Sequence, residues 1–337
     1  MNTRWGWLGA MVLGAVVSAC DGTMPGGNGP TALFAALPLP ADRIACVHPL
    51  GEVVLPGQVI GANFSRWDVH ERGACGAPIP FTGGPVPVFA AAGGTVVTVG
   101  GPDGRTVTVA VSENIEYTYT GVALDGFIRE GTDVPAGQRL GLVANPDSGI
   151  AFGITDYTKV NAWIATARYP DSYRHARHPV EFYEGALRTQ VVMRIGNIAA
   201  PAGRLVWDVD GRLSGNWFRE FTPRTAEAVT APWWEGHLSF RGDARFPDQP
   251  RIGLGTLFAG GCRCAPRSVE PAFDGVTPQT APVAYHLVRV RTDGTLTSEF
   301  FGTLLVELVA IDRLRVELFA GDVPAPVFSA AAEHFVR

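Results

Sequence analysis

The chain has 337 residues and a formal net charge of −5, and 46% of its residues are hydrophobic. This length is enough for two domains that each bury a core. A nucleic-acid surface needs a basic stripe, so the mild acidity argues against a nucleic-acid partner. The chain contains 41 glycines and 26 prolines, which is typical of many turns between short strands. We therefore expect a mainly β protein.

The N-terminus has the composition of a bacterial export signal. Arg4 supplies a positive start, and residues 5–17 form an apolar stretch too short to span a bilayer. The stretch leads into the run VSAC, which ends at Cys20 and resembles the lipobox of bacterial lipoproteins. The resemblance implies a signal peptide at 1–19 and a lipid on Cys20. We expect this lipid to anchor the protein in the bacterial cell envelope, on the periplasmic or outer side of a membrane. An ordinary signal peptide with a coincidental cysteine is the alternative.

Four further cysteines then lie in an oxidising compartment. Cys46 and Cys75 are a candidate disulfide pair near the start of the first domain. Cys262 and Cys264 are separated by one residue, so a bridge between them closes a small, strained ring. Pairing across the two sets stays open. Neither set has the two-residue spacing of zinc ligands, so we expect no metal there.

The composition divides the rest of the chain into four parts. Residues 20–41 are rich in glycine, proline and small side chains, and we expect a flexible tether. In residues 42–168, apolar and polar residues alternate in short runs between glycine-rich turns, which predicts antiparallel strands. Residues 169–198 form the helical connector, and residues 199–337 are again rich in alternating runs.

We expect the connector to contain one short, capped helix. Pro179 lies near its start, Glu181 and Glu184 lie in its early part, and Arg188 lies late. Proline at the first turn, acidic residues early and basic residues late are the usual pattern of helix ends.

The C-terminal part reads as consecutive hairpins. Asp-Gly and Asp-Arg turns separate several of its runs, at Asp210, Asp293 and Asp312. Such hairpins either close a barrel or stack as a sandwich. The run Gly215-Asn216-Trp217 resembles the Gly-x-Trp of lipocalin barrels, in which the tryptophan closes one end. That resemblance implies a late arginine packed on Trp217, either Arg337 or Arg315.

Two blocks in the first β domain carry a second resemblance. Residues 87–96 read PVFAAAGGTV, and residues 131–141 read GTDVPAGQRLG. In this order they resemble the LytM-like, lysostaphin-type fold of the M23 zinc peptidases. A biotinyl-carrier-like hairpin domain is the alternative, because such domains share the V-x-x-G-Q element. The resemblance implies an antiparallel β fold over some seventy residues.

The residues that give the M23 family its chemistry are missing. The family binds zinc through a His-x-x-x-Asp before the first block and a His-x-His after the second. Residues 148–154 (SGIAFGI) contain no histidine, cysteine or carboxylate, and residues 117–120 (YTYT) stand where the family has T-x-Y-x-H. A catalytic zinc needs about three protein ligands. We therefore expect a pseudo-peptidase with no catalytic residue, metal or cofactor.

Other candidate residues are weaker. Trp217, Trp233 and Trp234 are candidates for ligand contact, with core packing as the alternative. His175 and His178 form either a metal or anion site or, as we expect, part of a solvated, partly basic surface.

The sequence therefore predicts an envelope lipoprotein that binds or scaffolds, with peptidoglycan or a partner envelope enzyme as ligand. Two alternatives stay open. One is an active zinc peptidase with displaced ligands, drawn from His48, Asp68, His70 or Glu71. The other is a lipocalin-like carrier of an apolar ligand within residues 200–337.

Overall fold

The structure is a computed structural model. It describes residues 33–53, 58–69, 83–101, 104–195, 200–229, 236–291 and 294–337. The expected signal peptide, the lipidation site Cys20, and the candidates His70, Glu71, Cys75, Trp233 and Trp234 lie outside these ranges. The described residues belong to one compact unit. Among the described residues, no helix combines the length and the apolar character needed to cross a bilayer.

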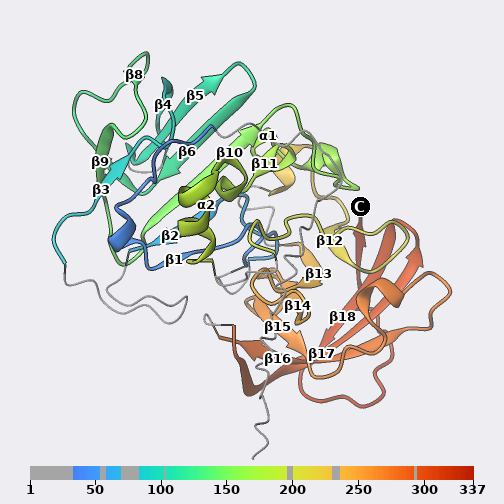
Figure 1. Cartoon of the computed structure of the whole chain (residues 1–337). Coiled ribbons are helices and arrows are strands. Elements are labelled where there is room, and N and C mark those ends of the chain that lie inside the picture. The colour runs from blue at the N-terminus through green and yellow to red at the C-terminus, as the bar shows by residue number, and fades with distance from the viewer. Residues whose placement is uncertain are drawn as a thin grey trace, which may run out of the picture. The chain divides into compact units, whose positions relative to one another are not determined.

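The first β unit, which we define as residues 33–195, contains two antiparallel sheets (Figure 1). The larger sheet has the order β1-β2-β10-β6-β5-β4-β8, and β11 also pairs with β10. Its strands are β1 (Cys46–Val47), β2 (Ser65–Asp68), β4 (Gly94–Gly100), β5 (Thr106–Ser112), β6 (Ile115–Thr120), β8 (Asp133–Val134), β10 (Ile150–Asp156) and β11 (Ala176–Arg177). The smaller sheet has the order β3-β9-β7, with strands β3 (Pro87–Phe89), β7 (Val122–Leu124) and β9 (Arg139–Val143).

The larger sheet buries one of its faces. Tyr117 and Tyr119 of β6 and Phe152 of β10 are fully buried, and the rings of Tyr119 and Phe152 lie 4.6 Å apart. Because side chains alternate along a strand, the residues between them point to the opposite face. That outer face carries the cavity described below.

Residues 33–41 pack on this core instead of forming part of a tether. Phe34 is 4% exposed, and its ring lies 5.5 Å from those of Phe152 and Phe182. The backbone amide of Ala35 donates to the carbonyl of Ala91 at 2.9 Å. Small residues and prolines suggested a tether, but one buried aromatic ring and these backbone hydrogen bonds are enough to hold the segment.

The connector is helical but broken. Short 3-10 turns at Thr166–Arg168 and Pro179–Phe182 alternate with α1 (Asp171–Arg174) and α2 (Gly185–Val192). Pro179 and Glu181 act at a helix start as expected, since the backbone amide of His178 donates to Glu181. The single helix of the sequence interpretation is divided because Tyr183 and Glu184 are extended, and Gly185 after them takes a left-handed φ of +52°.

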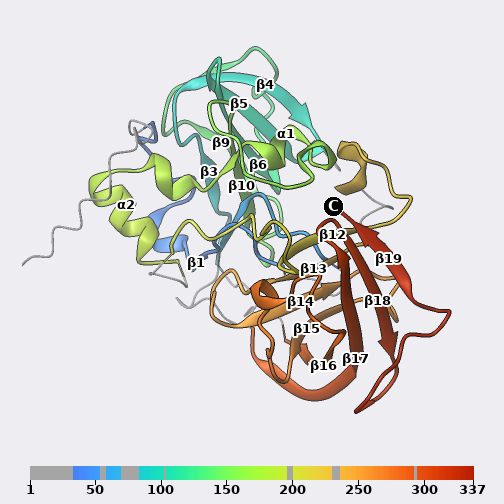
Figure 2. The ribbon, with the colours of Figure 1, turned by 90° about the vertical axis from the view of Figure 1, so that its right-hand side faces the viewer.

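The C-terminal part is a closed antiparallel barrel, which decides between barrel and sandwich. Each strand pairs with the next, and β12 pairs with β19 (Figure 2). The strands are β12 (Gly215–Arg219), β13 (Leu238–Gly242), β14 (Pro250–Leu254), β15 (Cys262–Pro266), β16 (Val283–Val290), β17 (Leu296–Ala310), β18 (Arg313–Phe319) and β19 (Glu333–Val336). Further 3-10 turns lie at Ala41–Arg43, Ala226–Val229 and Phe273–Gly275.

Large side chains pack in the barrel core. The rings of Phe240 and Tyr285 each lie 5.4 Å from that of Phe273. Cys262 and Cys264 belong to the same core and form a disulfide with each other, with a Cα–Cα distance of 5.4 Å. The sequence left open whether Cys262 and Cys264 pair with each other or with the other two cysteines, and in the structure they pair with each other.

A third apolar cluster joins the first β unit to the barrel. Trp163 and Tyr169 stack with ring centroids 4.0 Å apart, and Phe218 of β12 packs against Tyr169 at 5.7 Å. Asn216 donates a hydrogen bond to the Tyr169 hydroxyl at 2.9 Å. The two parts thus share buried contacts as well as chain connections.

Candidate functional site

A cavity of about 270 Å³ opens on the outer face of the larger sheet. We call it the groove. The residues that line it come from β6, β10, the segment before β2 and α1. They are Asn63, Phe64, Thr118, Thr120, Ala151, Gly153, Ile154, Thr155 and Ser172.

The floor of the groove follows from strand register. Thr118 lies opposite Gly153, and Thr120 lies opposite Ala151. Their neighbours in sequence are the buried tyrosines and Phe152, so the period of two turns these four residues outward. The Thr118 hydroxyl lies 2.9 Å from that of Thr108, on the next strand. The floor is therefore formed by two threonines, one alanine and one glycine.

One wall of the groove is held by a link between distant segments. The side-chain amide of Asn63 donates to the carbonyl of Ser172 at 2.8 Å. Phe64, next to it, is 39% exposed. An exposed aromatic ring beside a cavity is available for stacking against a ligand. Sequence reasoning missed both Asn63 and Phe64, since no local pattern distinguishes them.

The groove brings together the two segments in which the resemblance to M23 peptidases would place histidines. Residues 117–120 supply Thr118 and Thr120, while residues 148–154 supply Ala151 and Gly153, which have the spacing of a His-x-His pair. None of the nine lining residues is a histidine, cysteine or carboxylate. These side chains can donate and accept hydrogen bonds and pack against a ligand, but they supply no zinc ligand and no general base.

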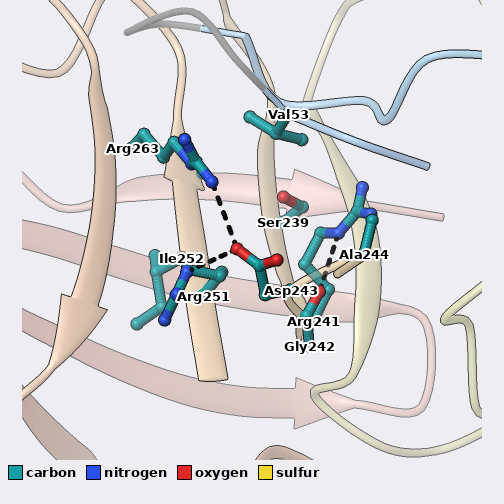
Figure 3. A pocket seen from close by; sticks show the side chains of 10 residues that line it. Val53, Ser239, Arg241, Gly242, Asp243, Ala244, Arg251, Ile252 and Arg263 are labelled. Atoms are coloured by element: carbon teal, nitrogen blue, oxygen red, sulfur yellow. Dashed lines mark hydrogen bonds and ion pairs between the residues drawn. The ribbon is translucent and has the colours of Figure 1, made fainter. Parts of the chain in front are cut away.

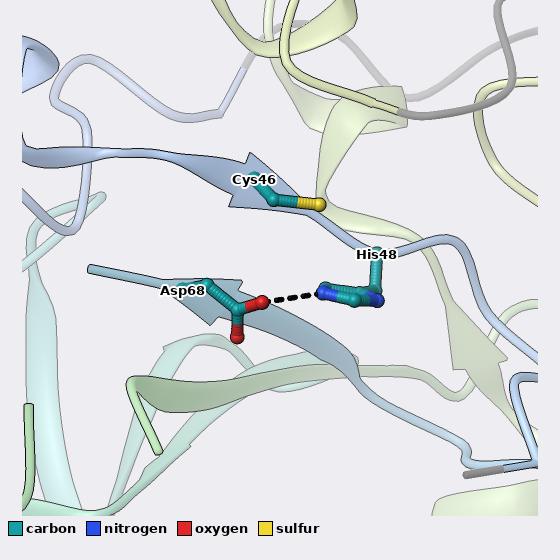
Figure 4. A group of neighbouring side chains, drawn as sticks. All are labelled: Cys46, His48 and Asp68. Atoms are coloured by element: carbon teal, nitrogen blue, oxygen red, sulfur yellow. Dashed lines mark hydrogen bonds and ion pairs between the residues drawn. The ribbon is translucent and has the colours of Figure 1, made fainter. Parts of the chain in front are cut away.

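A second cluster contains two residues of the displaced-ligand alternative. His48 Nε2 lies 2.7 Å from Asp68 Oδ2 (Figure 4). His48 Nδ1 lies 2.7 Å from Glu52 Oε2. Arg66 donates from Nε to Asp68 Oδ1 at 2.8 Å. Arg245, just beyond β13 of the barrel, has its Nε 3.4 Å from Glu52 Oε1. We call these five residues the His48 network.

The two carboxylates of this network favour the charged form of His48, while Arg66, whose Nη2 lies 2.9 Å from His48 Nε2, opposes it. Burial lowers the pKa of His48, but hydrogen bonds with Asp68 and Glu52 outweigh it and hold the pKa above its ordinary value. Burial raises the pKa of Asp68, but the hydrogen bond and charge of His48, together with Arg66, outweigh it and lower that pKa to about 2. The result is an imidazolium held between two carboxylates.

The same atoms do not fit a metal centre. Ligand atoms of Cys46, His48 and Asp68 lie within 4.8 Å of one another. Cys46 is in a disulfide, however, so its sulfur is not a thiolate. Both ring nitrogens of His48 face carboxylates, and the Arg66 guanidinium already supplies a cation beside Asp68. The cluster is thus a buried ionic network.

The two histidines of the connector have separate surroundings. His178 is fully buried, accepts from the backbone amide of Val180 through Nδ1, and has a pKa that burial lowers to about 4. Its Nε2 lies 3.2 Å from the carbonyl of His48. His175 Nδ1 lies 2.6 Å from the carbonyl of Lys159. The expected solvated surface is wrong for His178, because the connector folds it inward.

An arginine cluster lies on the outer side of the barrel. Arg251 and Arg263 donate to the buried carboxylate of Asp243 at 3.0 and 3.1 Å (Figure 3). The cavity beside them measures only about 10 Å³, the space of one water molecule. Arg241 donates to the carbonyl of Gly51, which ties the barrel to the first β unit. Each of the three arginines is adjacent in sequence to a core residue, namely Phe240, Ile252 or Cys264. This alternation was the sequence signal for the outer face, and the sequence analysis missed it.

At one end of the barrel, Arg337 covers Trp217. The Cζ atom of Arg337 lies 3.9 Å from the ring centroid of Trp217, and the Trp217 Nε1 donates to the carbonyl of Leu213 at 2.8 Å. Arg315 instead lies over Phe328 at 4.2 Å. Of the two arginines considered, the structure selects Arg337. Trp217 is fully buried, so it packs in the closed end of the barrel.

No family model and no curated protein matches this chain. Among solved structures, Csd3 from Helicobacter pylori is 16% identical with a TM-score of 0.30, and the match covers 46% of this chain and 34% of Csd3. The catalytic domain of the M23 protein EnpA from Enterococcus faecalis is 19% identical with a TM-score of 0.20, over 28% of this chain and 68% of that domain. A chain of the SpoIIQ–SpoIIIAH pore-forming complex is 15% identical with a TM-score of 0.31, over 46% of this chain and 93% of the other. M23 proteins are thus among the structures similar to part of this chain. Because the sequence identities and TM-scores are low, the similarity assigns no role to its residues.

Proposed function

We propose that this protein is a lipid-anchored protein of the bacterial cell envelope that binds peptidoglycan through the groove without cleaving it. The observation that carries the proposal is the floor of the groove. Two segments that lack the M23 histidines meet there and present Thr118, Thr120, Ala151 and Gly153. The alternative ligand of this surface is a partner envelope enzyme.

The chemistry of the groove supports recognition rather than hydrolysis. Peptide cleavage by a zinc enzyme needs a metal-bound hydroxide and a group that moves protons. The lining residues offer only hydroxyl, amide and apolar groups. Such groups bind a ligand by hydrogen bonds and packing, which is the usual character of a binding cavity.

The two alternatives have less support. The displaced-ligand peptidase is opposed by the His48 network, in which His48 and Asp68 are already neutralised by each other and by charged neighbours. The carrier of an apolar ligand is favoured by the closed barrel and by the Trp217–Arg337 contact. The aromatic rings packed in the barrel core oppose it.

The proposal is tested with soluble protein that starts after Cys20. The protein is offered zinc, dialysed, analysed for metal, and then mixed with purified cell-wall sacculi. We expect no retained zinc, no release of wall fragments, and sedimentation of the protein with the sacculi. About one retained zinc per chain together with wall cleavage would overturn the non-catalytic proposal. Protein that stays in solution while it captures an envelope enzyme would replace peptidoglycan by that partner.

A further inference from the structure

We infer that the groove recognises the uncharged sugar chain of the cell wall and not its charged peptides. This inference rests on the proposed function and names the ligand class of the same site. Several independent properties of the groove support it: its lack of charge, its hydrogen-bonding groups, its exposed aromatic ring, and a glycine that the fold does not require.

The lining of the groove is neutral. All nine residues that line it are uncharged at any ordinary pH. The neighbouring strand presents Arg66 opposite Ala151, but the guanidinium of Arg66 is paired with Asp68. Glu116 lies opposite Thr155 but does not line the groove. A carboxylate or ammonium group that left water for this groove would find no oppositely charged side chain among the lining residues, which is costly. A neutral ligand has no such penalty.

The polar groups of the groove match the hydroxyl and acetamido groups of a sugar. Thr118, Thr120 and Thr155 contribute hydroxyls, each able to donate and to accept. The threonine hydroxyls of β5 and β6 lie 2.9 Å apart in one pair and 3.2 Å in the next, which arranges them in rows. Phe64 adds an exposed ring on the wall, suited to the apolar face of a sugar ring.

Gly153 keeps the groove open although the backbone does not require a glycine there. Its φ is not left-handed, and an added Cβ would meet only the Cβ of Phe64 at 3.6 Å and the carbonyl of Asn63 at 3.9 Å. By contrast, Gly149 on the same chain segment has a φ of +62° and lies against the Trp67 carbonyl, so the fold itself requires it. The missing side chain at Gly153 therefore leaves the floor bare beside Phe64, and a side chain longer than a methyl group would extend into the groove.

The size of the groove sets the length of the recognised segment. Its volume of about 270 Å³ lies just below the range of small-molecule sites, which is about 300–1,000 Å³. It accommodates a short stretch of a sugar chain while the remainder of the chain runs on outside.

The deciding experiment fills the groove. Gly153→Leu places a side chain on the floor beside Phe64. Gly100→Leu is the matched control, because a Cβ at Gly100 meets nothing within 4 Å and Gly100 does not line the groove. Calorimetric titrations use a neutral N-acetylglucosamine tetramer and, separately, a charged wall stem peptide. We expect the unchanged protein and Gly100→Leu to bind the tetramer, Gly153→Leu to bind it at least tenfold more weakly, and the stem peptide not to bind.

The outcomes separate this inference from the proposed function. Sedimentation with sacculi but no binding of the tetramer, or binding that Gly153→Leu leaves intact, overturns the sugar inference alone. Binding of the stem peptide that Gly153→Leu abolishes also overturns it. If the unchanged protein does not sediment with sacculi, the proposed function is overturned. If Gly153→Leu does not fold, Thr120→Val removes one exposed hydroxyl at nearly constant volume and is expected to weaken tetramer binding.

Discussion

At the scale of single residues, Arg337 makes several interactions at once. Its guanidinium lies over Trp217 and donates to the carbonyls of Val209 and Leu213 at 3.0 and 3.1 Å, and to that of Ser214. Burial lowers the pKa of Arg337 to about 10, a value at which it stays charged at neutral pH. Arg337 therefore closes the barrel end at which β12 begins.

Replacing Arg337 is expected to destabilise the barrel. Arg337→Ala removes a cation–π contact and leaves buried carbonyls without a donor, which corresponds to a loss of about 2–4 kcal/mol in unfolding free energy. Urea unfolding followed by tryptophan fluorescence measures this loss. Arg315→Ala is the control, because Arg315 lies over Phe328 near the surface. Equal losses in both variants would contradict the role given to Arg337.

At the scale of elements, the His48 network joins the segment after β1 to β2 and to the barrel. His48 and Glu52 come from that segment, Asp68 comes from β2, and Arg245 follows β13. These groups are largely buried, so removing one charge leaves the others uncompensated. The network is therefore sensitive to the protonation of its members.

The pH dependence follows from the direction of each pKa shift. The pKa of His48 is raised, so its contribution to stability is complete below its ordinary pKa of about 6.5 and is lost as pH rises through the raised value. The pKa of Asp68 is lowered to about 2, so its contribution is complete above about 4 and is lost as pH falls toward 2. His178, with a pKa lowered to about 4, reduces stability as pH falls below about 6.5.

Above pH 6.5, the raised pKa of His48 is therefore expected to make stability depend on pH. We expect the unfolding free energy of the unchanged protein to fall as pH rises from about 6.5. His48→Gln should be less stable at pH 6.5 and should lack this fall, while His334→Gln, at an exposed position, should retain it. The measurement is urea unfolding at a series of pH values. An alkaline fall of the same size in His48→Gln would remove His48 as its cause.

At the scale of the whole molecule, the shared apolar cluster predicts coupled unfolding of the first β unit and the barrel. Phe218 is 1% exposed and touches Tyr169, while Arg168 lies over its ring at 4.6 Å. The ionic contact of Arg245 with Glu52 adds a second link. Buried contacts of this extent favour one cooperative transition.

Calorimetry tests this coupling. We expect the unchanged protein to unfold in a single heat-absorption peak. Phe218→Ala should lower stability by about 3–5 kcal/mol and separate the peak into two, because it removes a ring from the shared cluster. Phe221→Ala is the control, since Phe221 is 94% exposed. Two separate peaks in the unchanged protein would show that the parts unfold independently.

The sequence by itself determined the local features of this protein. Alternation of apolar and polar residues predicted a mainly β chain, because side chains of a strand alternate between faces. The absence of histidine from residues 117–120 and 148–154 could be read directly, as could the Gly215-x-Trp217 pattern. These signals depend on neighbours within a few positions, so no knowledge of the fold was needed.

Only the tertiary structure decided which distant residues meet. Pairing of β12 with β19 closes the barrel, and the same closure brings Arg337 onto Trp217. The approach of β6 to β10 creates the groove, and packing of residues 33–41 on the core replaces part of the expected tether. Such contacts join residues far apart in sequence, and their free energy comes from burial and pairing that local patterns do not specify.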